Sequence, residues 1–321
     1  MSVDTATRSF LDTLRASGGK PVYEQTIDEL RAMVRTVSLQ LGPPPVPVHR
    51  VVDRRIDVPG GSFGVRIYTP RPLGEGATLP IAVHYHGGGF AAGDLDTHAS
   101  LAAYYAVHGD AVVVDVDYRR PPEHRFPTAV EDAYAAALWA VDHAREIDGD
   151  PGRVAVIGDS AGGNLAAVVC QVAKARGRPA IAFQALIYPC TDMDYSASYA
   201  SRAQFGGGDY FLSTRDMEFF LSVYAGPTPD VRDPRLSPLA AADLSGLPPA
   251  LVVTAGHDLL RDEGKAYADR LAAAGVPVEY RCYEQTIHAF ISWANAIPTG
   301  FEALEFIAAR LKAGLHGAPA A

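Results

Sequence analysis

The sequence predicts an α/β fold built on a mostly parallel sheet. Short, nearly continuous apolar runs recur between residues 81 and 254, as in strands that are buried on both faces. Helical stretches separate these runs, and such alternation is typical of a doubly wound sheet. With 321 residues, of which 48% are hydrophobic and 20% charged, the chain can bury a large core. This composition excludes a disordered chain.

The first 48 residues are predicted to lie outside this alternation. Apolar residues recur at spacings of three and four, as on one face of a helix, at Ile27, Leu30, Val34, Val37 and Leu41. Gly42 and the three prolines that follow it end the helix. The helix either packs on the core or forms part of a lid, and its position in the sequence does not decide between these alternatives.

From residue 49 onward the predicted strands and helices follow one another to the end of the chain. Two half-exposed strands, 50–58 and 65–69, alternate apolar and polar residues and are joined by a Pro-Gly-Gly turn. Buried strands are predicted at residues 81–85, 111–116, 154–157, 181–187 and 250–254, with one more strand at 278–283. Helices are predicted at 97–107, 128–147, 161–175, 262–274 and 301–311.

One segment interrupts the alternation after the strand at residues 181–187. Residues 191–226 are rich in aromatic side chains, and open α/β sheets bind ligands at the carboxyl ends of their strands. The segment therefore either adds to the core or covers a binding site as a cap. If it is a cap, Tyr195, Phe205 and Phe211 are candidates for contacts with a substrate.

Charge and cysteine content exclude several classes of partner. The formal net charge of −9 repels phosphates, so we expect no nucleic-acid partner. No stretch approaches the roughly 18 uninterrupted apolar residues of a membrane span. Cys170, Cys190 and Cys282 show neither close pairing nor histidines at metal-ligand spacing. We therefore expect reduced thiols, no metal or other cofactor, and a cytoplasmic location, which the absence of an apolar leader also favours.

The strongest chemical signal is the sequence GDSAGG at residues 158–163. It follows the strand predicted at 154–157 and opens the helix predicted at 161–175, the context that a G-x-S-x-G nucleophile turn requires. Side chains two residues to either side of Ser160 would collide in so sharp a turn, which explains the two glycines. The structural alternative is a tight turn in which Ser160 only caps the helix.

A nucleophilic serine needs a base, and in this chain order the base lies downstream of the serine. Three histidines follow Ser160. His288 comes just after the strand predicted at 278–283, whereas His257 lies too close to the expected acid and His316 lies in the C-terminal tail. We therefore expect His288 to be the base.

The acid that orients the base is expected after the strand at residues 250–254. Asp258 stands at that position. Asp262 is its rival, but it begins a helical stretch and is predicted to be an N-cap. Asp192 and Asp194 lie at the end of the preceding strand and are weaker candidates. Asp258 would hold the imidazole tautomer and stabilise the imidazolium.

The third chemical element is HGGGF at residues 86–90, directly after the strand at 81–85. Consecutive glycines let backbone N–H groups converge on a developing oxyanion. The expected oxyanion hole is Gly88 and Gly89 together with Ala161, the residue after the nucleophile. His86 is expected to brace the loop. A flexible loop or a phosphate-binding loop is the alternative, but the Lys-Ser/Thr pair of a P-loop is absent from this motif.

Taken together, these motifs resemble those of the bacterial hormone-sensitive lipase family of carboxylesterases, in its GDSAGG branch. HGGGF at 86–90, GDSAGG at 158–163, residues 258–264 and HAF at 288–290 carry the resemblance, which extends from about residue 48 to 311. YRRPPEHRFP at 118–127 resembles the family segment YRLAPEHxFP. Arg120-Pro121, Leu259 and Ala289 depart from the family pattern, in which Leu-Ala, Pro and Gly are usual. None of these departures removes a reacting group.

The resemblance implies an α/β-hydrolase fold with a mostly parallel eight-stranded sheet, a catalytic domain at residues 49–321 and a helical cap made of residues 1–48 and about 191–226. It implies a serine carboxylesterase for short- to medium-chain esters, with Ser160, Asp258 and His288 as the triad, and frequent homodimers. An amidase, deacetylase or peptidase with the same triad is the alternative. A more distant alternative is a non-catalytic protein that binds a small molecule beneath the cap.

Overall fold

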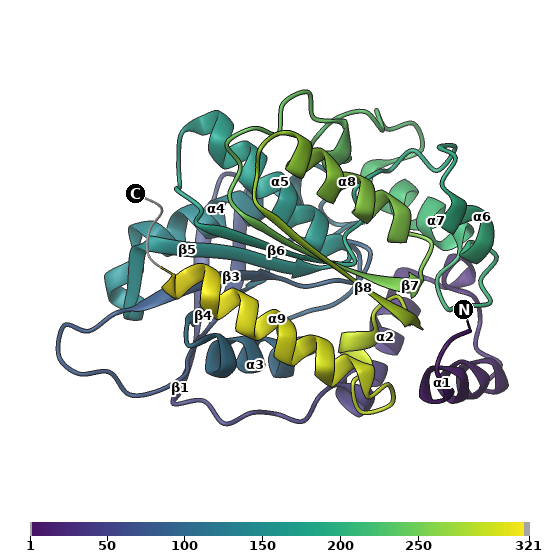
Figure 1. The fold of residues 1–321 in the computed structure, drawn as a ribbon, viewed down its shortest axis with the longest axis horizontal. Coiled ribbons are helices and arrows are strands. Elements are labelled where there is room, and N and C mark those ends of the chain that lie inside the picture. The colour runs from purple at the N-terminus through teal and green to yellow at the C-terminus, as the bar shows by residue number, and fades with distance from the viewer. Residues whose placement is uncertain (1, 318–321) are drawn as a thin grey trace.

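One eight-stranded sheet organises residues 2–317, the part of the chain that the computed structural model describes (Figure 1). The strand order is β1-β2-β4-β3-β5-β6-β7-β8. β1 pairs with β2 and β2 with β4 in antiparallel fashion, and every later pairing is parallel. The strands are β1 (Arg50–Val58), β2 (Gly61–Thr69), β3 (Leu79–Tyr85), β4 (Val112–Asp117), β5 (Gly149–Asp159), β6 (Phe183–Ile187), β7 (Ala250–His257) and β8 (Val278–Ile287).

Helices cover both faces of the sheet (Figure 1). α4, α5 and α8 lie on one face, and α3 and α9 pack together on the other. Their bounds are α3 (Ala99–Gly109), α4 (Thr128–Asp142), α5 (Ala161–Arg176), α8 (Arg261–Ala273) and α9 (Thr299–His316). Among residues 2–317, no helix has both the length and the apolar character needed to cross a membrane.

The remaining four helices gather at the end of the sheet toward which β7 and β8 point (Figure 1). They are α1 (Thr5–Ala16), α2 (Ile27–Leu41), α6 (Ala200–Phe205) and α7 (Thr214–Ala225). Thr26 and Glu29 form a capping box that begins α2, and Ser213 and Asp216 do the same for α7. Four short 3-10 turns complete the structure, at Val22–Glu24, Ala144–Ile147, Pro238–Ala240 and Phe290–Trp293.

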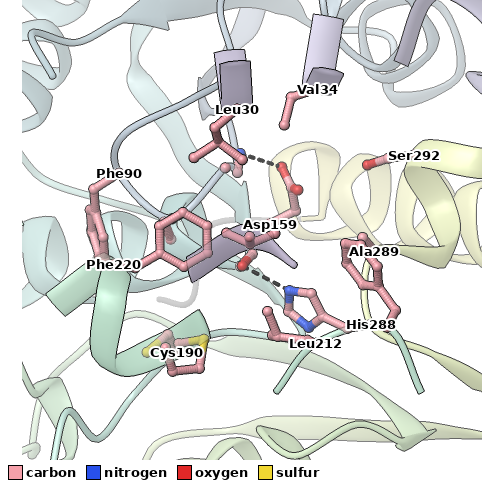
Figure 2. A pocket seen from close by; sticks show the side chains of 18 of the residues that line it. Leu30, Val34, Phe90, Asp159, Cys190, Leu212, Phe220, His288, Ala289 and Ser292 are labelled. Carbon is pink, nitrogen blue, oxygen red and sulfur yellow. Dashed lines mark hydrogen bonds between the residues drawn. The ribbon is translucent and has the colours of Figure 1, made fainter. Parts of the chain in front are cut away.

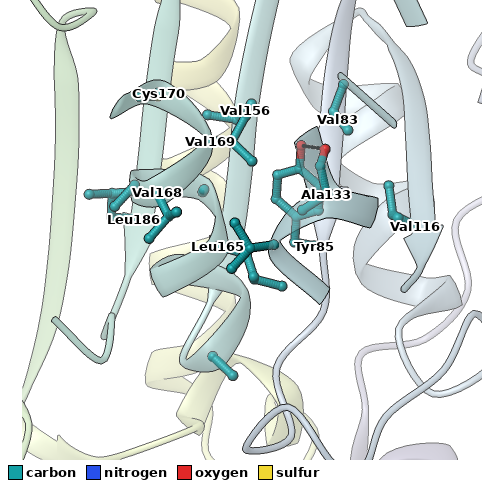
Figure 3. Packing of buried hydrophobic residues seen from close by; sticks show 14 of the residues in the cluster. Val83, Tyr85, Val116, Ala133, Val156, Leu165, Val168, Val169, Cys170 and Leu186 are labelled. Carbon is teal, nitrogen blue, oxygen red and sulfur yellow. Dashed lines mark hydrogen bonds between the residues drawn. The ribbon is translucent and has the colours of Figure 1, made fainter. Parts of the chain in front are cut away.

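Two apolar clusters, one on each face, hold the sheet and the helices together. Successive side chains of a strand point to opposite faces. Val83 and Val156 therefore enter the cluster under α4 and α5, whereas Ala82 and Ala155 enter the cluster under α3 and α9. Figure 3 shows the first cluster, in which the hydroxyl of the buried Tyr85 donates to a backbone carbonyl of α4 at 2.8 Å. Each buried valine or leucine stabilises the fold by about 1.5–3 kcal/mol.

The fold class, the eight strands and the mostly parallel order are confirmed. Several details differ from the sequence-based expectation, among them the start of β2 at Gly61 and the end of β8 at Ile287. The helix predicted at 128–147 is two elements, because α4 ends at Asp142 and residues 144–147 form a 3-10 turn. The strand predicted at 154–157 begins earlier, at Gly149. α1 lies within residues 1–48, which were expected to be part of a helical cap, but its bounds were not predicted.

Candidate active site

Ser160 occupies a sharp turn between β5 and α5. Its backbone is held at φ 55 and ψ −117, a conformation that non-glycine residues rarely adopt and that stores strain of about 1–3 kcal/mol. The flanking glycines make this turn possible. A Cβ on Gly162 would lie 1.9 Å from the carbonyl oxygen of Tyr85, and one on Gly158 would lie 2.2 Å from the carbonyl oxygen of Gly162. The packing of the turn against β3 therefore requires the G-x-S-x-G pattern.

Two hydrogen bonds join Ser160, His288 and Asp258. His288 Nε2 lies 2.9 Å from Ser160 Oγ, and His288 Nδ1 lies 2.7 Å from Asp258 Oδ2. The histidine side chain is 5% exposed and the aspartate side chain is fully buried. Because Nδ1 faces a carboxylate, the neutral ring carries its proton there, and the lone pair of Nε2 faces the serine hydroxyl. The structure thus brings together the three residues that the sequence analysis selected.

The turn after β8 places His288 opposite the serine. Ala289 follows it at φ 63, in the left-handed region where the family pattern has glycine, at a cost of about 1 kcal/mol. The ring of Tyr188 packs against His288 with centroids 4.7 Å apart. The two other downstream histidines bond elsewhere. Nδ1 of His257 lies 3.1 Å from a backbone carbonyl of β8. His316 ends α9, and its Nε2 lies 3.0 Å from the backbone carbonyl oxygen of Asp110.

The rival carboxylates have other partners. Asp262 is the second residue of α8 and not its N-cap, so that expectation is wrong. Its carboxylate accepts a hydrogen bond from the backbone N–H of Ser201 at 2.8 Å. Asp192 accepts from the hydroxyl of Tyr199 at 2.8 Å, and Asp194 accepts from a backbone N–H of its own loop. Asp258 is the carboxylate that His288 contacts.

The loop at residues 86–90, here called the glycine loop, lies beside the serine turn. Gly88 and Gly89 both adopt positive φ, at 115 and 60. A Cβ on Gly88 would lie 2.3 Å from the carbonyl oxygen of Ala92, and one on Gly89 would lie 2.2 Å from the ring of Phe220. Within residues 2–317, the backbone N–H groups of Gly88, Gly89 and Ala161 donate no hydrogen bond to another protein group. These three donors remain available to a ligand.

An apolar pocket lies above these groups (Figure 2). Its walls come from the two segments expected to form a cap. The N-terminal helices contribute Phe10, Leu14, Val22, Leu30, Met33, Val34 and Val37, and the 191–226 segment contributes Met193, Tyr195, Phe211, Leu212, Met217, Phe220 and Leu221. Of the three aromatic candidates, Tyr195 and Phe211 line the pocket. Phe205 is not among the lining residues, because its ring packs against Tyr210 and His257 at 5.2 Å.

Several residues at the floor of the pocket carried no sequence signal. Cys190 lines it, and burial raises the pKa of its thiol well above the ordinary value, so the thiol is neutral. His98 and Asp159 also line it, with side chains only 5% exposed and the imidazole Nε2 3.6 Å from the carboxylate. Trp293 stacks on Phe10 with centroids 4.8 Å apart. In the described part of the chain, no three His, Cys, Asp or Glu side chains are grouped as ligands for one metal ion.

The chain is similar along most of its length to proteins that are named as esterases. Residues 82–292 match the family model described as the alpha/beta hydrolase fold. The esterase LipI of Mycobacterium tuberculosis is 44% identical over 280 residues, which cover 85% of this chain and 86% of that protein.

Two solved structures are also similar to this chain in sequence and fold. A structure of an ester hydrolase from the metagenome of Lake Arreo, complexed with a derivative of bipyridine phosphonate, is 41% identical with a TM-score of 0.91, covering 97% of this chain and 98% of that one. A thermostable esterase from Pseudomonas putida ECU1011 is 38% identical with a TM-score of 0.92, covering 98% of both chains. Together with its motifs, these matches show that the chain has the α/β-hydrolase fold and belongs to the hormone-sensitive lipase family.

Proposed function

We propose that this protein is a carboxylic ester hydrolase in which Ser160 is the nucleophile, His288 the general base and acid, and Asp258 the residue that orients His288. The observation that carries the proposal is the chain of hydrogen bonds of 2.9 and 2.7 Å at the floor of an apolar pocket. The names of the relatives support the ester class, since they include an esterase, a carboxylic ester hydrolase and a carboxylesterase.

In the first half of the reaction, His288 Nε2 takes the proton of Ser160 Oγ while that oxygen attacks the ester carbonyl carbon. The carbonyl oxygen becomes an oxyanion, and the new imidazolium is stabilised by the carboxylate of Asp258. When the oxyanion collapses, the bond to the alcohol oxygen breaks. His288 gives its proton to the departing alcohol, and the acyl group stays on Ser160.

In the second half, water replaces the alcohol. His288 Nε2 takes a proton from the water as its oxygen attacks the acyl carbonyl, and a second oxyanion forms. When this oxyanion collapses, the bond between the acyl carbon and Ser160 Oγ breaks. The proton on His288 returns to Oγ, the carboxylic acid leaves, and the enzyme is restored.

The free N–H groups of Gly88, Gly89 and Ala161 are the proposed oxyanion hole. Ala161 directly follows Ser160, whereas Gly88 and Gly89 belong to the glycine loop, where their positive φ and the close contacts that a Cβ would make exclude larger residues. Such donors stabilise charge as it develops, and each is worth roughly 10²–10³ in kcat. Ala161 also stands at the first turn of α5, where the helix dipole favours a negative charge.

The pocket suits a small-molecule ester with apolar groups. We propose that α1, α2 and the 191–226 segment act as the cap, because together they supply most of its walls, including Tyr195 and Phe211. Short to medium acyl chains are the proposed substrates. The three unpaired cysteines, two of them buried, support a cytoplasmic location.

A panel of p-nitrophenyl esters, from acetate to laurate, compared with the matched p-nitroanilides, tests this function. We expect hydrolysis of the esters with the highest kcat/KM at short to medium acyl chains, and much slower turnover of the anilides. Faster turnover of the anilides than of the esters would identify an amidase. A folded protein that hydrolyses no member of the panel would support the non-catalytic alternative and overturn the proposal.

A further inference from the structure

A group of ionisable side chains lies buried behind the glycine loop, between the sheet and α3, and the proposed mechanism uses none of them. His84 Nδ1 lies 2.7 Å from a carboxylate oxygen of Asp115. The ring of His98 lies 6.0 Å from that of His84 and 5.4 Å from that of His86, measured between centroids. Asp159, the residue before the serine, faces His98. All five side chains are buried, so their charges are weakly screened by solvent.

The groups around His98 can accept a proton from each of its ring nitrogens. The hydroxyl of Thr97 donates its one proton to the carbonyl oxygen of Asp94 at 2.8 Å and accepts from the N–H of Asp94 at 2.8 Å. His98 Nδ1 lies 2.9 Å from this hydroxyl oxygen, and while the hydroxyl proton is given to Asp94 the ring nitrogen supplies the proton of that bond. Nε2 faces Asp159 Oδ1 at 3.6 Å, a distance suited to attraction between opposite charges. This arrangement accommodates a proton on each ring nitrogen, as an imidazolium requires.

Asp159 connects His98 to the glycine loop. Its Oδ1 accepts a hydrogen bond from the backbone N–H of Gly87 at 3.0 Å. A Cβ on Gly87 would lie only 2.4 Å from the other carboxylate oxygen, so the loop and the carboxylate are in close contact. Figure 2 shows Asp159 in the pocket, and the two peptides after Gly87 carry the proposed oxyanion donors. A shift or loss of the Asp159 carboxylate would therefore change the position of these donors, because one hydrogen bond connects the carboxylate to their loop.

The surrounding charges favour an ion pair between His98 and Asp159. Burial lowers the pKa of His98, but Asp159, followed by Asp115 and Asp94, outweighs burial and raises the pKa overall. Burial raises the pKa of Asp159, and His98 outweighs it to give a lowered value. His86 has a pKa well below its ordinary value, because of burial and then the charge of His98. The groups that face His98 and His86 are His84, Asp94, Asp115, Asp159, Arg120 and Tyr118, whose ring stacks on that of His86.

We propose that His98 is a positioning residue that acts as an imidazolium: it neutralises the carboxylate of Asp159, which in turn holds the Gly87 N–H and thereby the oxyanion donors of Gly88 and Gly89. This inference rests on the proposed function. The neutralisation matters because a lone carboxylate beside the oxyanion hole would oppose the negative charge that develops on the substrate. The hydrogen bond matters because catalytic donors must be held in place before the reaction.

The proposal predicts a decline of kcat at alkaline pH. When His98 loses its proton, Asp159 is left as an uncompensated buried charge, and kcat falls as the pH rises through the raised pKa of His98. His98→Gln leaves this carboxylate uncompensated at every pH. We expect it to lower kcat by roughly 10- to 100-fold, with little change in KM and without the alkaline decline.

Removal of both charges provides the decisive comparison. Asp159→Asn keeps an oxygen that accepts from Gly87 but needs no cation, so we expect its kcat to lack the alkaline decline. The double variant His98→Gln/Asp159→Asn should have a higher kcat than His98→Gln alone. His108→Gln is the matched control, because His108 is exposed near the end of α3, the helix that His98 caps, and its ring packs at a tilt against Tyr104; we expect its pH profile to equal that of the wild type.

Measurement of kcat and KM for an activated ester from pH 6 to 10 in the five proteins completes the test. A wild-type kcat and pH profile in His98→Gln would overturn the proposal, as would a double variant no more active than His98→Gln. If His98→Gln does not fold, retention of the alkaline decline in Asp159→Asn would overturn it equally. A wild-type enzyme that hydrolyses no ester would instead contradict the proposed function itself.

Discussion

Replacing Ser160 with alanine is expected to lower kcat for a p-nitrophenyl ester by about 10⁴- to 10⁶-fold. The substitution removes the oxygen that lies 2.9 Å from His288 Nε2, so no acyl-enzyme can form. The donors of the glycine loop and the apolar pocket remain, and they account for whatever residual rate is left. KM should change little, because the serine hydroxyl is a small part of the pocket surface. Steady-state kinetics on the purified variant measure both constants.

The control for this substitution is Ser222→Ala. Ser222 is an exposed residue of α7 whose hydroxyl donates to a backbone carbonyl of its own helix, so its removal should leave kcat unchanged. Circular dichroism and thermal unfolding should show that both variants fold. If Ser160→Ala retains kcat within tenfold of the wild type, Ser160 is not the nucleophile, and the proposed mechanism fails.

The second large effect is expected from Asp258→Asn, which should lower kcat by roughly 10⁴-fold. Asp258 Oδ2 lies 2.7 Å from His288 Nδ1, and its other oxygen accepts from the backbone N–H of Leu260 at 2.9 Å. An amide at this position can donate to Nδ1 and so favour the tautomer in which Nε2 carries the proton. That tautomer has no lone pair to accept the proton of Ser160.

Asp262→Asn is the matched control for the acid, since it is the rival carboxylate that follows the same strand. It bonds to the backbone of Ser201 and to the side chain of Arg261, and not to the histidine. We expect its kcat to stay within a few-fold of the wild type. A loss of kcat that is larger in Asp262→Asn than in Asp258→Asn would show that the acid is Asp262 and that its assignment to Asp258 is wrong.

The sequence predicts the sheet well because the information is local. Apolar runs such as the one at 81–85, which only His84 interrupts, are nearly continuous because both faces of the strand are covered, and every residue of the strand is buried. The bend after α4 was not predicted, because residues 128–147 continue an apolar pattern past His143, where the backbone leaves the helix at φ −110 and ψ 18. The bounds of α1 were not predicted either, and the contact of its Phe10 with Trp293 joins residues far apart in the sequence.

Some parts of the candidate site, like some parts of the fold, were predictable from the sequence and others were not. Ser160, Asp258 and His288 each follow a strand with a recognisable motif, so their meeting in space was predictable from chain order, while their roles stay predictions. The pocket walls were only partly predictable. Phe220 touches Gly89 from a helix 131 positions later in the sequence, and nothing in the local pattern of either residue announces the contact. His98 and Asp159 are 61 positions apart, and they meet only when the N-cap of α3 lies beside the end of β5.

Mass spectrometry after treatment with a fluorophosphonate tests the central claim most directly. A phosphonate reacts covalently with a serine that has an adjacent base and an oxyanion hole, and the adduct reports which oxygen attacked. The account predicts one adduct per chain, located on the peptide that contains Ser160, with loss of esterase activity in proportion to labelling. It predicts no adduct in Ser160→Ala. Full inactivation with the adduct on any other residue would contradict the account.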